Sequence, residues 1–370
     1  MGILNDIHGL GQSIWYDFIS RDFIASGRML ELVQKGIRGM TSNPTIFEQA
    51  IASGSDYDEQ IRTLDQSGSS LEDIATALFV TDIQNACDVI RPVYDESAGE
   101  DGYISLEVSP TLAHDTEATI AEAYRLWKAV DRPNLMIKIP ATPEGIPAIR
   151  TCISEGLNVN ITLIFSLQQY QAVAEAYIQG LEDRKNNGGE IQNIHSVASV
   201  FVSRIDSMID GQLINMGTPE ALTLQGKAGV ANTKLVYRSF QQIFSGKRWE
   251  ELQKNGANLQ RPLWASTSTK NPEYPDLLYV DTLIGPHTVN TVPPATLEGI
   301  LDHGKAVSSV TDGVSKAEED LRQIEATGIS LATVMDDLLR EGVEKFAKSF
   351  HTLFEKLQAK REHLRTNSVS

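Results

Sequence analysis

The stretch LMIKIPA at residues 135–141 places a lysine within an aliphatic run, two residues before a proline. Successive side chains of a β-strand point to opposite faces, so Leu135, Ile137 and Ile139 share one face and Lys138 lies on the other. Apolar runs of this length are typical of parallel strands that are buried on both faces. We therefore expect a buried strand with Lys138 on its inner face.

Seven further β-rich runs flank this stretch and alternate with longer helical segments. They are SIWYDFI (13–19), GIRGMTS (36–42), YISLEVS (103–109), VNITLIFS (159–166), SVASVFVS (196–203), PLWASTS (262–268) and LLYVDTL (277–283). Parallel strands need a crossover of a dozen or more residues, which the helical segments can supply. Eight such units predict an α/β fold, a (β/α)₈ TIM barrel.

Local signals place several helices between the runs. Ser69 and Glu72 form a predicted capping box, and Pro92 is expected to end the helix that follows them. Asp115 is a candidate N-cap for the next helix, and Ser166 is expected to form the turn from the fifth run into its helix. These signals fit strand–helix alternation.

Two long gaps and the C-terminal segment carry additional helices. Residues 44–102 are expected to hold two helices, and residues 204–261 hold further ones. Residues 294–365 are predicted to be helical throughout, with an i, i+4 stripe of phenylalanines that we interpret as core packing. No repeat or Pro/Gly-rich linker divides the chain, so residues 1–370 are predicted to form a single barrel domain with helical insertions and a helical C-terminal segment.

Composition excludes several classes of function. The chain has 370 residues and a net charge of −17, which argues against a nucleic-acid or anionic-membrane binder because both would be repelled. No apolar run is long enough to span a membrane, and the N-terminus lacks the features of a signal peptide. The two cysteines, Cys87 and Cys152, have no metal-ligand spacing and indicate a reducing compartment. We expect a soluble cytoplasmic protein.

Lys138 is the first candidate for chemistry. Burial disfavours the charged form of an amine, and only the neutral amine attacks a carbonyl to form a carbinolamine and then a Schiff base. The alternative is a lysine near the strand end that extends to solvent or pairs with a carboxylate. The run by itself leaves both interpretations open.

Four other runs carry polar side chains with the same period of two. Their polar faces hold Trp15 with Asp17, Ser105 with Glu107, Asn158 with Asn160, Thr162 and Ser166, and Ser199 with Phe201 and Ser203. In the fifth run, Leu163 and Phe165 are expected on the opposite, outward face. Active sites of (β/α)₈ enzymes lie at the carboxyl ends of the strands. A lysine, two carboxylates, amides and hydroxyls are therefore predicted to converge there, whereas the scattered histidines offer no metal-ligand spacing.

At this point the sequence resembles the transaldolase family, whose members form a Schiff base within a class I aldolase barrel. The resemblance covers nearly the whole chain, and its most specific stretches are MTSNPTIF, LMIKIPATPEGIPAI and GLNVNITLIFS, with SLEVSP and SVFVSRID in support. The length of the chain resembles the longer bacterial form of the enzyme.

The resemblance implies a role for each matching residue. Lys138 would form the Schiff base, Asp17 would accept the hydroxyl proton during carbon–carbon cleavage, and Glu107 would act with Thr162 through a water during imine formation and hydrolysis. Residues implied in substrate binding are Asn43 and Asn160 for the dihydroxyacetone moiety, Ser199, Phe201 as a wall of the pocket, and Arg204 as a phosphate ligand.

The seventh run departs from the short form of the family, in which an Ala-Ser-Phe-Arg stretch supplies a second cation. Here Lys270 is the substitute cation and Ser266 a hydroxyl donor, although the alignment can slip by one or two positions. Arg204 does not share the inward parity of Ser199, so it is expected past the strand end, where a phosphate would sit. Arginine is the preferred planar partner of phosphate.

The function implied is transfer of a dihydroxyacetone unit from sedoheptulose 7-phosphate to glyceraldehyde 3-phosphate in the pentose phosphate pathway, with no cofactor or metal. Small sugar phosphates are the expected partners, and the oligomeric state stays open between monomer and homodimer. The alternatives are a fructose 6-phosphate aldolase, a catalytically silent sugar-phosphate-binding barrel and a metal-dependent aldolase. Because the substrates are anions and the protein is acidic, we expect a small positive patch at the barrel mouth.

Overall fold

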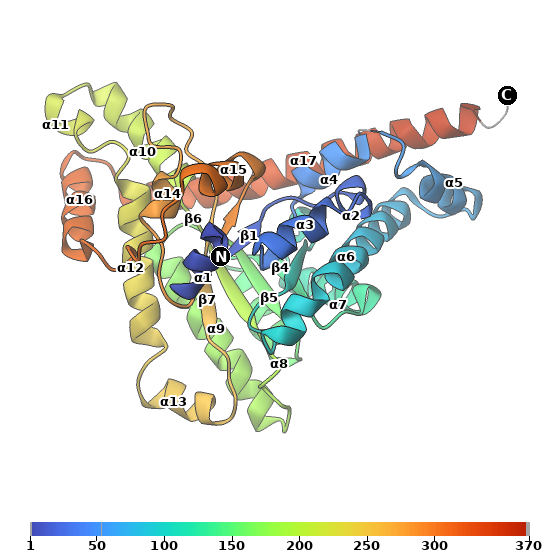
Figure 1. The fold of residues 1–370 in the computed structure, drawn as a ribbon, viewed down its shortest axis with the longest axis horizontal. Coiled ribbons are helices and arrows are strands. Elements are labelled where there is room, and N and C mark those ends of the chain that lie inside the picture. Colours follow the sequence, from blue (N-terminus) through green and yellow to red (C-terminus); the bar gives the residue numbers. More distant parts are fainter. Residues whose placement is uncertain (1, 53, 368–370) are drawn as a thin grey trace.

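The computed structural model describes residues 2–52 and 54–367, and within them eight parallel strands form a closed barrel (Figure 1). The strands are β1 (Gln12–Tyr16), β2 (Gly39–Thr41), β3 (Tyr103–Glu107), β4 (Leu135–Pro140), β5 (Val159–Ile164), β6 (Ser196–Phe201), β7 (Gln260–Ala265) and β8 (Thr288–Val292). They follow one another in chain order around the barrel, and β8 pairs with β1 to close it. The predicted (β/α)₈ barrel is confirmed.

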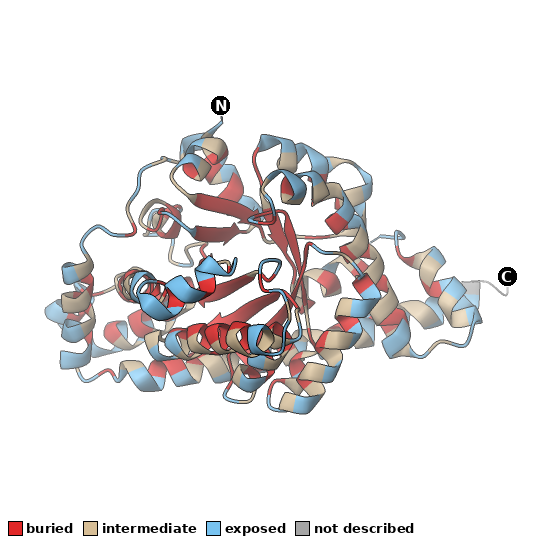
Figure 2. Cartoon of the chain, turned by 90° about the horizontal axis from the view of Figure 1, so that it is seen from below, coloured by how far each residue is buried: buried red, intermediate tan, exposed pale blue. Residues whose placement is uncertain are grey.

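Helices connect and surround the strands, so that buried strands lie inside a shell of helices with exposed outer faces (Figure 2). From the N-terminus through the first half of the chain they are α1 (Ile3–Gly9), α2 (Arg21–Ala25), α3 (Arg28–Lys35), α4 (Pro44–Ala52), α5 (Asp58–Gln66), α6 (Leu71–Glu96), the 3₁₀ turn η1 (Pro110–Leu112), α7 (Thr116–Val130), α8 (Gly145–Ser154) and α9 (Leu167–Asn186). The remainder are α10 (Ser203–Met216), α11 (Pro219–Leu222), α12 (Ala228–Ile243), α13 (Lys247–Lys254), α14 (Leu278–Asp281), α15 (Pro294–His303), α16 (Val314–Ala326) and α17 (Leu331–Asn367).

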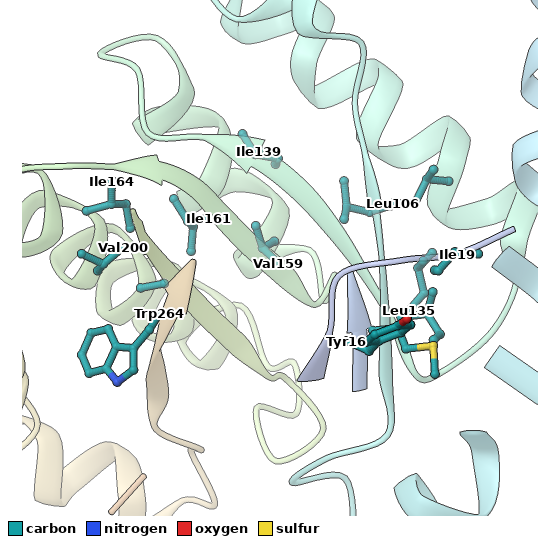
Figure 3. Close-up of a cluster of buried hydrophobic side chains, with 14 of the residues drawn as sticks. Tyr16, Ile19, Leu106, Leu135, Ile139, Val159, Ile161, Ile164, Val200 and Trp264 are labelled. Carbon is teal, nitrogen blue, oxygen red and sulfur yellow. The ribbon is translucent and has the colours of Figure 1, made fainter. Parts of the chain in front are cut away.

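Two hydrophobic clusters separate the outside of the barrel from its inside. The outer cluster joins the outward faces of the strands to the helices and includes Leu135, Ile139 and Val200 (Figure 3). The second cluster, called the inner cluster below, includes Met136 and Phe201 of the strands and continues into residues of α10, α16 and α17. The period-two parity of the sequence therefore assigns Met136, and with it Lys138, to the interior as predicted.

The eighth strand is the main error of the sequence analysis. The run at 277–283 forms the short helix α14, and the strand is TVNTV at 288–292. The run is apolar because it is buried against the outside of the barrel, where Trp264 Nε1 donates a hydrogen bond to the Leu283 carbonyl. Apolar content reports burial, and a buried helical turn satisfies it as well as a strand does.

A β-bulge in β5 overturns one parity assignment. The pairing of β5 with β6 shifts register between Ile161 and Ile164, and Leu163 has a positive φ of 59°. Leu163 and Phe165 consequently belong to the inner cluster and not to the outer one. A bulge adds one residue to a strand and redirects the side chains that follow, which parity alone does not anticipate.

Helix boundaries agree with the sequence at some caps and differ at others. Asp115 and Ser166 are the N-caps of α7 and α9, as expected. The cap of α6 is Ser70 and not Ser69, and α6 continues through Pro92 to Glu96. A proline inside a helix removes one N–H bond and crowds the carbonyl four residues earlier, and the packing of α6 offsets this cost.

The two segments expected to be rich in helix also differ from prediction. The described residues of the segment 44–102 contain three helices before β3, α4, α5 and α6, and not two. Residues 304–313 between α15 and α16 are not helical, so the segment 294–365 is interrupted. Lys234 Nζ donates to the carbonyls of Ser309 and Asp312 and so holds this connection to α12.

The long helix α17 crosses the barrel and extends beyond it (Figure 1). It packs along α4 and contacts α10, α5 and the carboxyl end of β5. A Cβ at Gly342 would lie 2.9 Å from Leu163 Cδ2, so the absence of a side chain lets α17 approach the bulge closely. No helix of the described residues is long and apolar enough to cross a membrane.

Candidate active site

One cavity of about 170 Å³ opens at the carboxyl ends of the strands. Nine of the eleven residues proposed from the sequence line it: Asp17, Asn43, Lys138, Thr162, Ser199, Phe201, Arg204, Ser266 and Lys270. Residues that the sequence analysis did not single out complete the lining, among them Thr41, Ser268, Thr291 and Phe346. The structure therefore brings the predicted set together, with Glu107 and Asn160 outside the lining.

Lys138 lies in the middle of β4 and does not extend to solvent. Its side chain is 7% exposed, and its Nζ donates a hydrogen bond of 3.0 Å to the Ser42 carbonyl. Glu107 Oε2 lies 3.5 Å from the same Nζ. Extension to solvent is therefore excluded, whereas the carboxylate partner that the alternative also named is present in Glu107, inside the barrel.

Asp17 follows β1 directly, and a hydrogen bond from a threonine of β2 holds its carboxylate in place. Thr41 Oγ1 donates to Asp17 Oδ1 at 2.6 Å, and Thr291 Oγ1 lies 2.8 Å from Thr41 Oγ1. Burial raises the pKa of Asp17, and the charge of Lys138 and the hydrogen bond from Thr41 oppose that rise. A carboxyl group with a raised pKa is suited to exchange protons near neutral pH.

Glu107 ends β3 and shares a layer of the barrel with Lys138. The register pairs Glu107 with Lys138 and Lys138 with Asn160. Burial raises the pKa of Glu107, Lys138 opposes the rise, and the charge of Asp17 adds to it. Among the described residues, Glu107 Oε2 and Thr162 Oγ1 are both buried without a hydrogen-bond partner, which is unusual for buried polar atoms.

Asn160 and Asn43 differ in how closely they approach the cavity. Asn160 is fully buried, donates from Nδ2 to Ser105 Oγ at 3.0 Å and accepts from Ser199 Oγ at 2.7 Å. It therefore supports the cavity from beneath, and direct contact with substrate stays a prediction. Asn43 lines the cavity and its Oδ1 accepts the N–H of Ile46 at the start of α4.

The outer part of the cavity holds two cations. The Arg204 guanidinium lies over the rings of Phe201 and Phe346, 5.2 and 5.9 Å from their centroids. Its Nη1 is buried and has no hydrogen-bond partner within the described chain. Desolvation lowers the pKa of Arg204. Two aromatic faces thus hold the guanidinium in place, which leaves its N–H groups for an anion.

Lys270 lies beside Arg204, as the sequence analysis expected for a second cation. Its Nζ donates to Ser268 Oγ at 2.7 Å, and burial followed by the charge of Arg204 lowers its pKa. Ser266, at a positive φ of 54°, has its Oγ 2.9 Å from Ser203 Oγ. The expected positive patch at the barrel mouth is present in these two side chains.

The residues that sequence reasoning missed had signals of uneven strength. Thr41 stands inside MTSNPTIF and on the inward parity of β2, so it was within reach. Thr291 was missed because its strand was assigned elsewhere. Phe346 belongs to the phenylalanine stripe interpreted as core packing, and nothing in the sequence places that part of α17 at the mouth.

Comparisons with known proteins agree with this arrangement. The family model described as Transaldolase/Fructose-6-phosphate aldolase matches residues 14–357. A protein named transaldolase from Parafrankia sp. (strain EAN1pec) is 48% identical over 357 residues, covering 96% of this chain and 97% of its own. Transaldolases of Thermobifida fusca (strain YX) and Trichodesmium erythraeum (strain IMS101) are 48% and 47% identical, each covering 96% of this chain and 97% of their own. The chain belongs to the transaldolase/fructose-6-phosphate aldolase family.

Proposed function

We propose that this protein is a transaldolase that transfers a dihydroxyacetone unit from sedoheptulose 7-phosphate to glyceraldehyde 3-phosphate, giving erythrose 4-phosphate and fructose 6-phosphate. The observation that carries the proposal is a buried Lys138 between two carboxyl groups of raised pKa, in reach of a cavity whose far end holds two cations. The name shared by relatives that match 96% of the chain supports the same activity.

The first step is Schiff-base formation. Neutral Lys138 Nζ attacks the ketose carbonyl carbon, and the carbonyl oxygen becomes the hydroxyl of a carbinolamine. Glu107 gives a proton to that hydroxyl, water leaves, and the nitrogen forms the imine. Glu107 Oε2, which lies 3.5 Å from Lys138 Nζ but accepts no hydrogen bond among the described residues, and Thr162 Oγ1 are the groups that would hold the departing water and return it at hydrolysis.

The second step is carbon–carbon cleavage. Asp17 accepts the proton of the hydroxyl on C4, one of the two carbons of the breaking C3–C4 bond. The C4 oxygen forms the aldehyde of the leaving aldose, and the electron pair of the C3–C4 bond moves toward the imine nitrogen. The aldose leaves and an enamine stays on Lys138. Addition of this enamine to the second aldehyde reverses the electron flow, and Asp17 returns its proton to the new hydroxyl.

The remaining residues seat the sugar. Arg204 and Lys270 would bind the phosphate group, because neither forms an ion pair with a carboxylate among the described residues. Asn43 and Ser199 would bind hydroxyls of the dihydroxyacetone moiety, and Phe201 would form a wall. Asn160 would act through its bond to Ser199.

Two broader features accompany the proposal. Both cysteines are free and buried, which suits a cytoplasmic enzyme. We treat residues 1–370 as a single catalytic domain, because α17 contributes Phe346 to the cavity of the barrel. Nucleic acid is not an expected partner at a net charge of −17.

Trapping with borohydride tests the mechanism. Incubation with fructose 6-phosphate and reduction should give a stable adduct on the peptide that contains Lys138. Lys138→Arg should abolish adduct and turnover, whereas Lys128→Arg, at an exposed position of α7, should keep both. An adduct elsewhere, or full activity of Lys138→Arg, would disprove the assignment.

Product analysis separates transfer from simple cleavage. With an acceptor aldose, a transaldolase forms a new ketose phosphate and releases little free dihydroxyacetone. Release of dihydroxyacetone as the main product, with or without acceptor, would identify the fructose 6-phosphate aldolase activity that the family description also contains. The carboxylate at Glu107 favours the transferase.

A further inference from the structure

A second cavity lies at the opposite end of the barrel from Lys138. Its volume is about 320 Å³, and its lining includes Tyr103, Met136, His195, Gln253 and Arg261. Tyr103 and Met136 stand at the amino-terminal ends of β3 and β4, and Arg261 stands at that end of β7. The space equals roughly ten water molecules at the volume that each occupies in the liquid.

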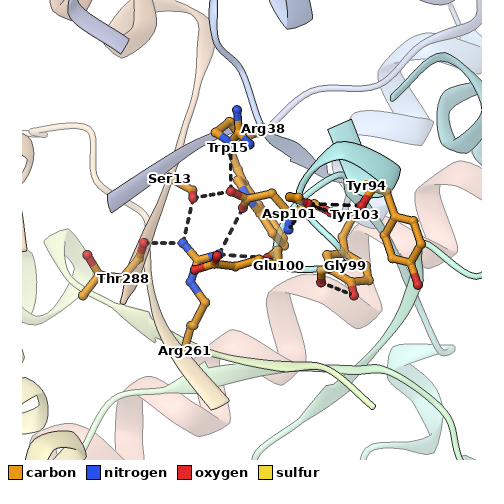
Figure 4. Close-up of polar contacts among 11 residues, drawn as sticks. Ser13, Trp15, Arg38, Tyr94, Gly99, Glu100, Asp101, Tyr103, Arg261 and Thr288 are labelled. Atoms are coloured by element: carbon orange, nitrogen blue, oxygen red, sulfur yellow. Dashed lines mark hydrogen bonds and ion pairs between the residues drawn. The ribbon is translucent and has the colours of Figure 1, made fainter. Parts of the chain in front are cut away.

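A network of charged and polar side chains adjoins this cavity through Arg261, the member of the network that lines it (Figure 4). Asp101 is 1% exposed and forms ion pairs with Arg38 and Arg261 at 2.9 and 3.0 Å. Ser13 Oγ donates to Asp101 Oδ2 at 2.7 Å, and Trp15 Nε1 donates to Oδ1 at 3.3 Å. The carboxylate is thus shared between two guanidinium groups.

The network holds one more positive than negative charge. Burial alone would raise the pKa of Asp101, but Arg261, Ser13 and Arg38 together hold it below the usual value, so Asp101 is ionised. His195 adds no charge at neutral pH, because burial and the nearby Arg261 lower its pKa to about 4. Glu100 also lines the cavity, but it is exposed at the rim, where solvent screens its charge.

The contacts of Arg261 favour a ligand site over a network that only fills the end of the barrel. Its side chain is 8% exposed. Nη1 donates to Asp101 Oδ1 and the Glu100 carbonyl, and Nη2 donates to Ser13 Oγ and the Thr288 carbonyl. Its Nε is buried and has no hydrogen-bond partner among the described residues. A network that served only to fill the end of the barrel would be expected to satisfy this donor.

A second donor adjoins the same space. Asn258 Nδ2 donates to the carbonyls of Gln192 and Ile194 and lies 3.3 Å from His195 Nε2. In its neutral form the His195 ring keeps one N–H donor. A neutral imidazole N–H and a guanidinium Nε–H beside an excess positive charge are donors that suit an oxyanion.

We propose that the cavity at the amino-terminal end of the barrel is a second binding site, for a small molecule that carries a phosphate or carboxylate group, with Arg261 as its charged ligand. The site lies apart from the sugar cavity and does not depend on the function proposed above. Net charge excess, the unpartnered Nε and the size of the cavity are the three observations that carry it.

The test uses inorganic phosphate and citrate as probes, at constant ionic strength, on full-length protein. Because Arg204 and Lys270 would also bind anions, the binding experiment is done in the double variant Arg204→Gln/Lys270→Met. The readouts are the thermal melting midpoint and the Nε–H resonance of Arg261 in ¹⁵N-labelled protein. We expect at least one probe to raise the midpoint saturably and to shift that resonance, and the probe that succeeds identifies the group bound.

Arg261 variants can fail to fold, because Arg261 belongs to the charge network. The location of the site is therefore tested with variants of Gln253, which lies outside that network. Gln253 is an exposed residue of α13 that lines the cavity, and Gln253→Trp should occlude it. The matched control is Gln241→Trp, the same exchange at an exposed position of α12 outside the cavity.

The expected result is a dissociation constant raised about tenfold or more by Gln253→Trp and unchanged by Gln241→Trp. In an otherwise unaltered chain, neither exchange should change transferase activity. Absence of any response to both probes at millimolar concentration, or equal responses in the two tryptophan variants, would overturn the proposal.

Discussion

Replacing Thr41 with valine tests the proposed role of Asp17 through a residue that need not touch the substrate. Valine keeps the shape of threonine and removes the hydroxyl that donates to Asp17 Oδ1 at 2.6 Å. A hydrogen bond to a charged acceptor contributes about 1.5–3 kcal/mol, and about 1.4 kcal/mol is a factor of ten in a protonation equilibrium. Thr41→Val should therefore increase the proton affinity of Asp17 by about tenfold to a hundredfold.

The sign of the kinetic effect follows from the proposed mechanism. Asp17 must be ionised to accept the hydroxyl proton, so activity falls as pH decreases through its pKa. Burial already raises that pKa, and the loss of the Thr41 bond raises it further. The acid limb of kcat should move to higher pH in Thr41→Val and keep its position in Thr41→Ser. The measurement is the pH profile of erythrose 4-phosphate release; an unmoved limb in Thr41→Val, or an equal movement in Thr41→Ser, would refute the reasoning.

Three further predictions follow from other parts of the chain. Lys270→Met should lower kcat/KM for fructose 6-phosphate about tenfold to a hundredfold, because one charged hydrogen bond is lost. Turnover of unphosphorylated fructose should stay nearly unchanged. Equal losses for both sugars would show that Lys270 does not bind phosphate. Gly342→Leu should reduce the free energy of unfolding by about 1–3 kcal/mol, because its Cβ would lie 2.9 Å from Leu163; urea denaturation measures it, and an unchanged midpoint would show that α17 adjusts freely. Burial raises the pKa of Asp206 from 3.8 to about 6, so its contribution to stability is complete below pH 3.8 and is lost, by about 3 kcal/mol in total, as pH rises through the window from 3.8 to 6. Between pH 4.5 and 8 about 2 kcal/mol of this fall should be measured for the unaltered protein and be missing in Asp206→Asn. A parallel slope in both proteins would contradict the prediction.

Strand parity carried most of what the sequence could show about the site. Alternation in the run around Lys138 assigned it to the interior, and the same rule brought Asp17 and Thr162 to one cavity. Parity specifies a face, however, and not a depth along the barrel. Asn160 is level with Lys138 in the register, but its short side chain stays beneath the cavity that the longer lysine reaches.

Three features lay beyond the sequence for identifiable physical reasons. The segment at 277–283 is more apolar than TVNTV, and burial against the barrel produces that pattern without a strand. The bulge at Leu163 depends on how β5 pairs with β6, a relation between residues far apart in the chain. The placement of Phe346 depends on where α17 packs, and helical periodicity defines only the apolar face of a helix and not its neighbour.

The cations of the cavity differ from those on the surface of this acidic protein in whether they pair with carboxylates. Surface arginines such as Arg248 pair with carboxylates, here Glu175 and Glu182. Arg204 and Lys270 form no ion pair within the described chain, although the protein carries 49 acidic residues. Burial lowers the pKa of Arg204 against the opposing charge of Glu341, and partial desolvation together with the charge of Arg204 lowers the pKa of Lys270. Holding two cations together without a carboxylate partner costs stability unless an anion joins them. The surface therefore repels anions in general, and the mouth attracts an anion that reaches Arg204, whose guanidinium is held over Phe201 and Phe346.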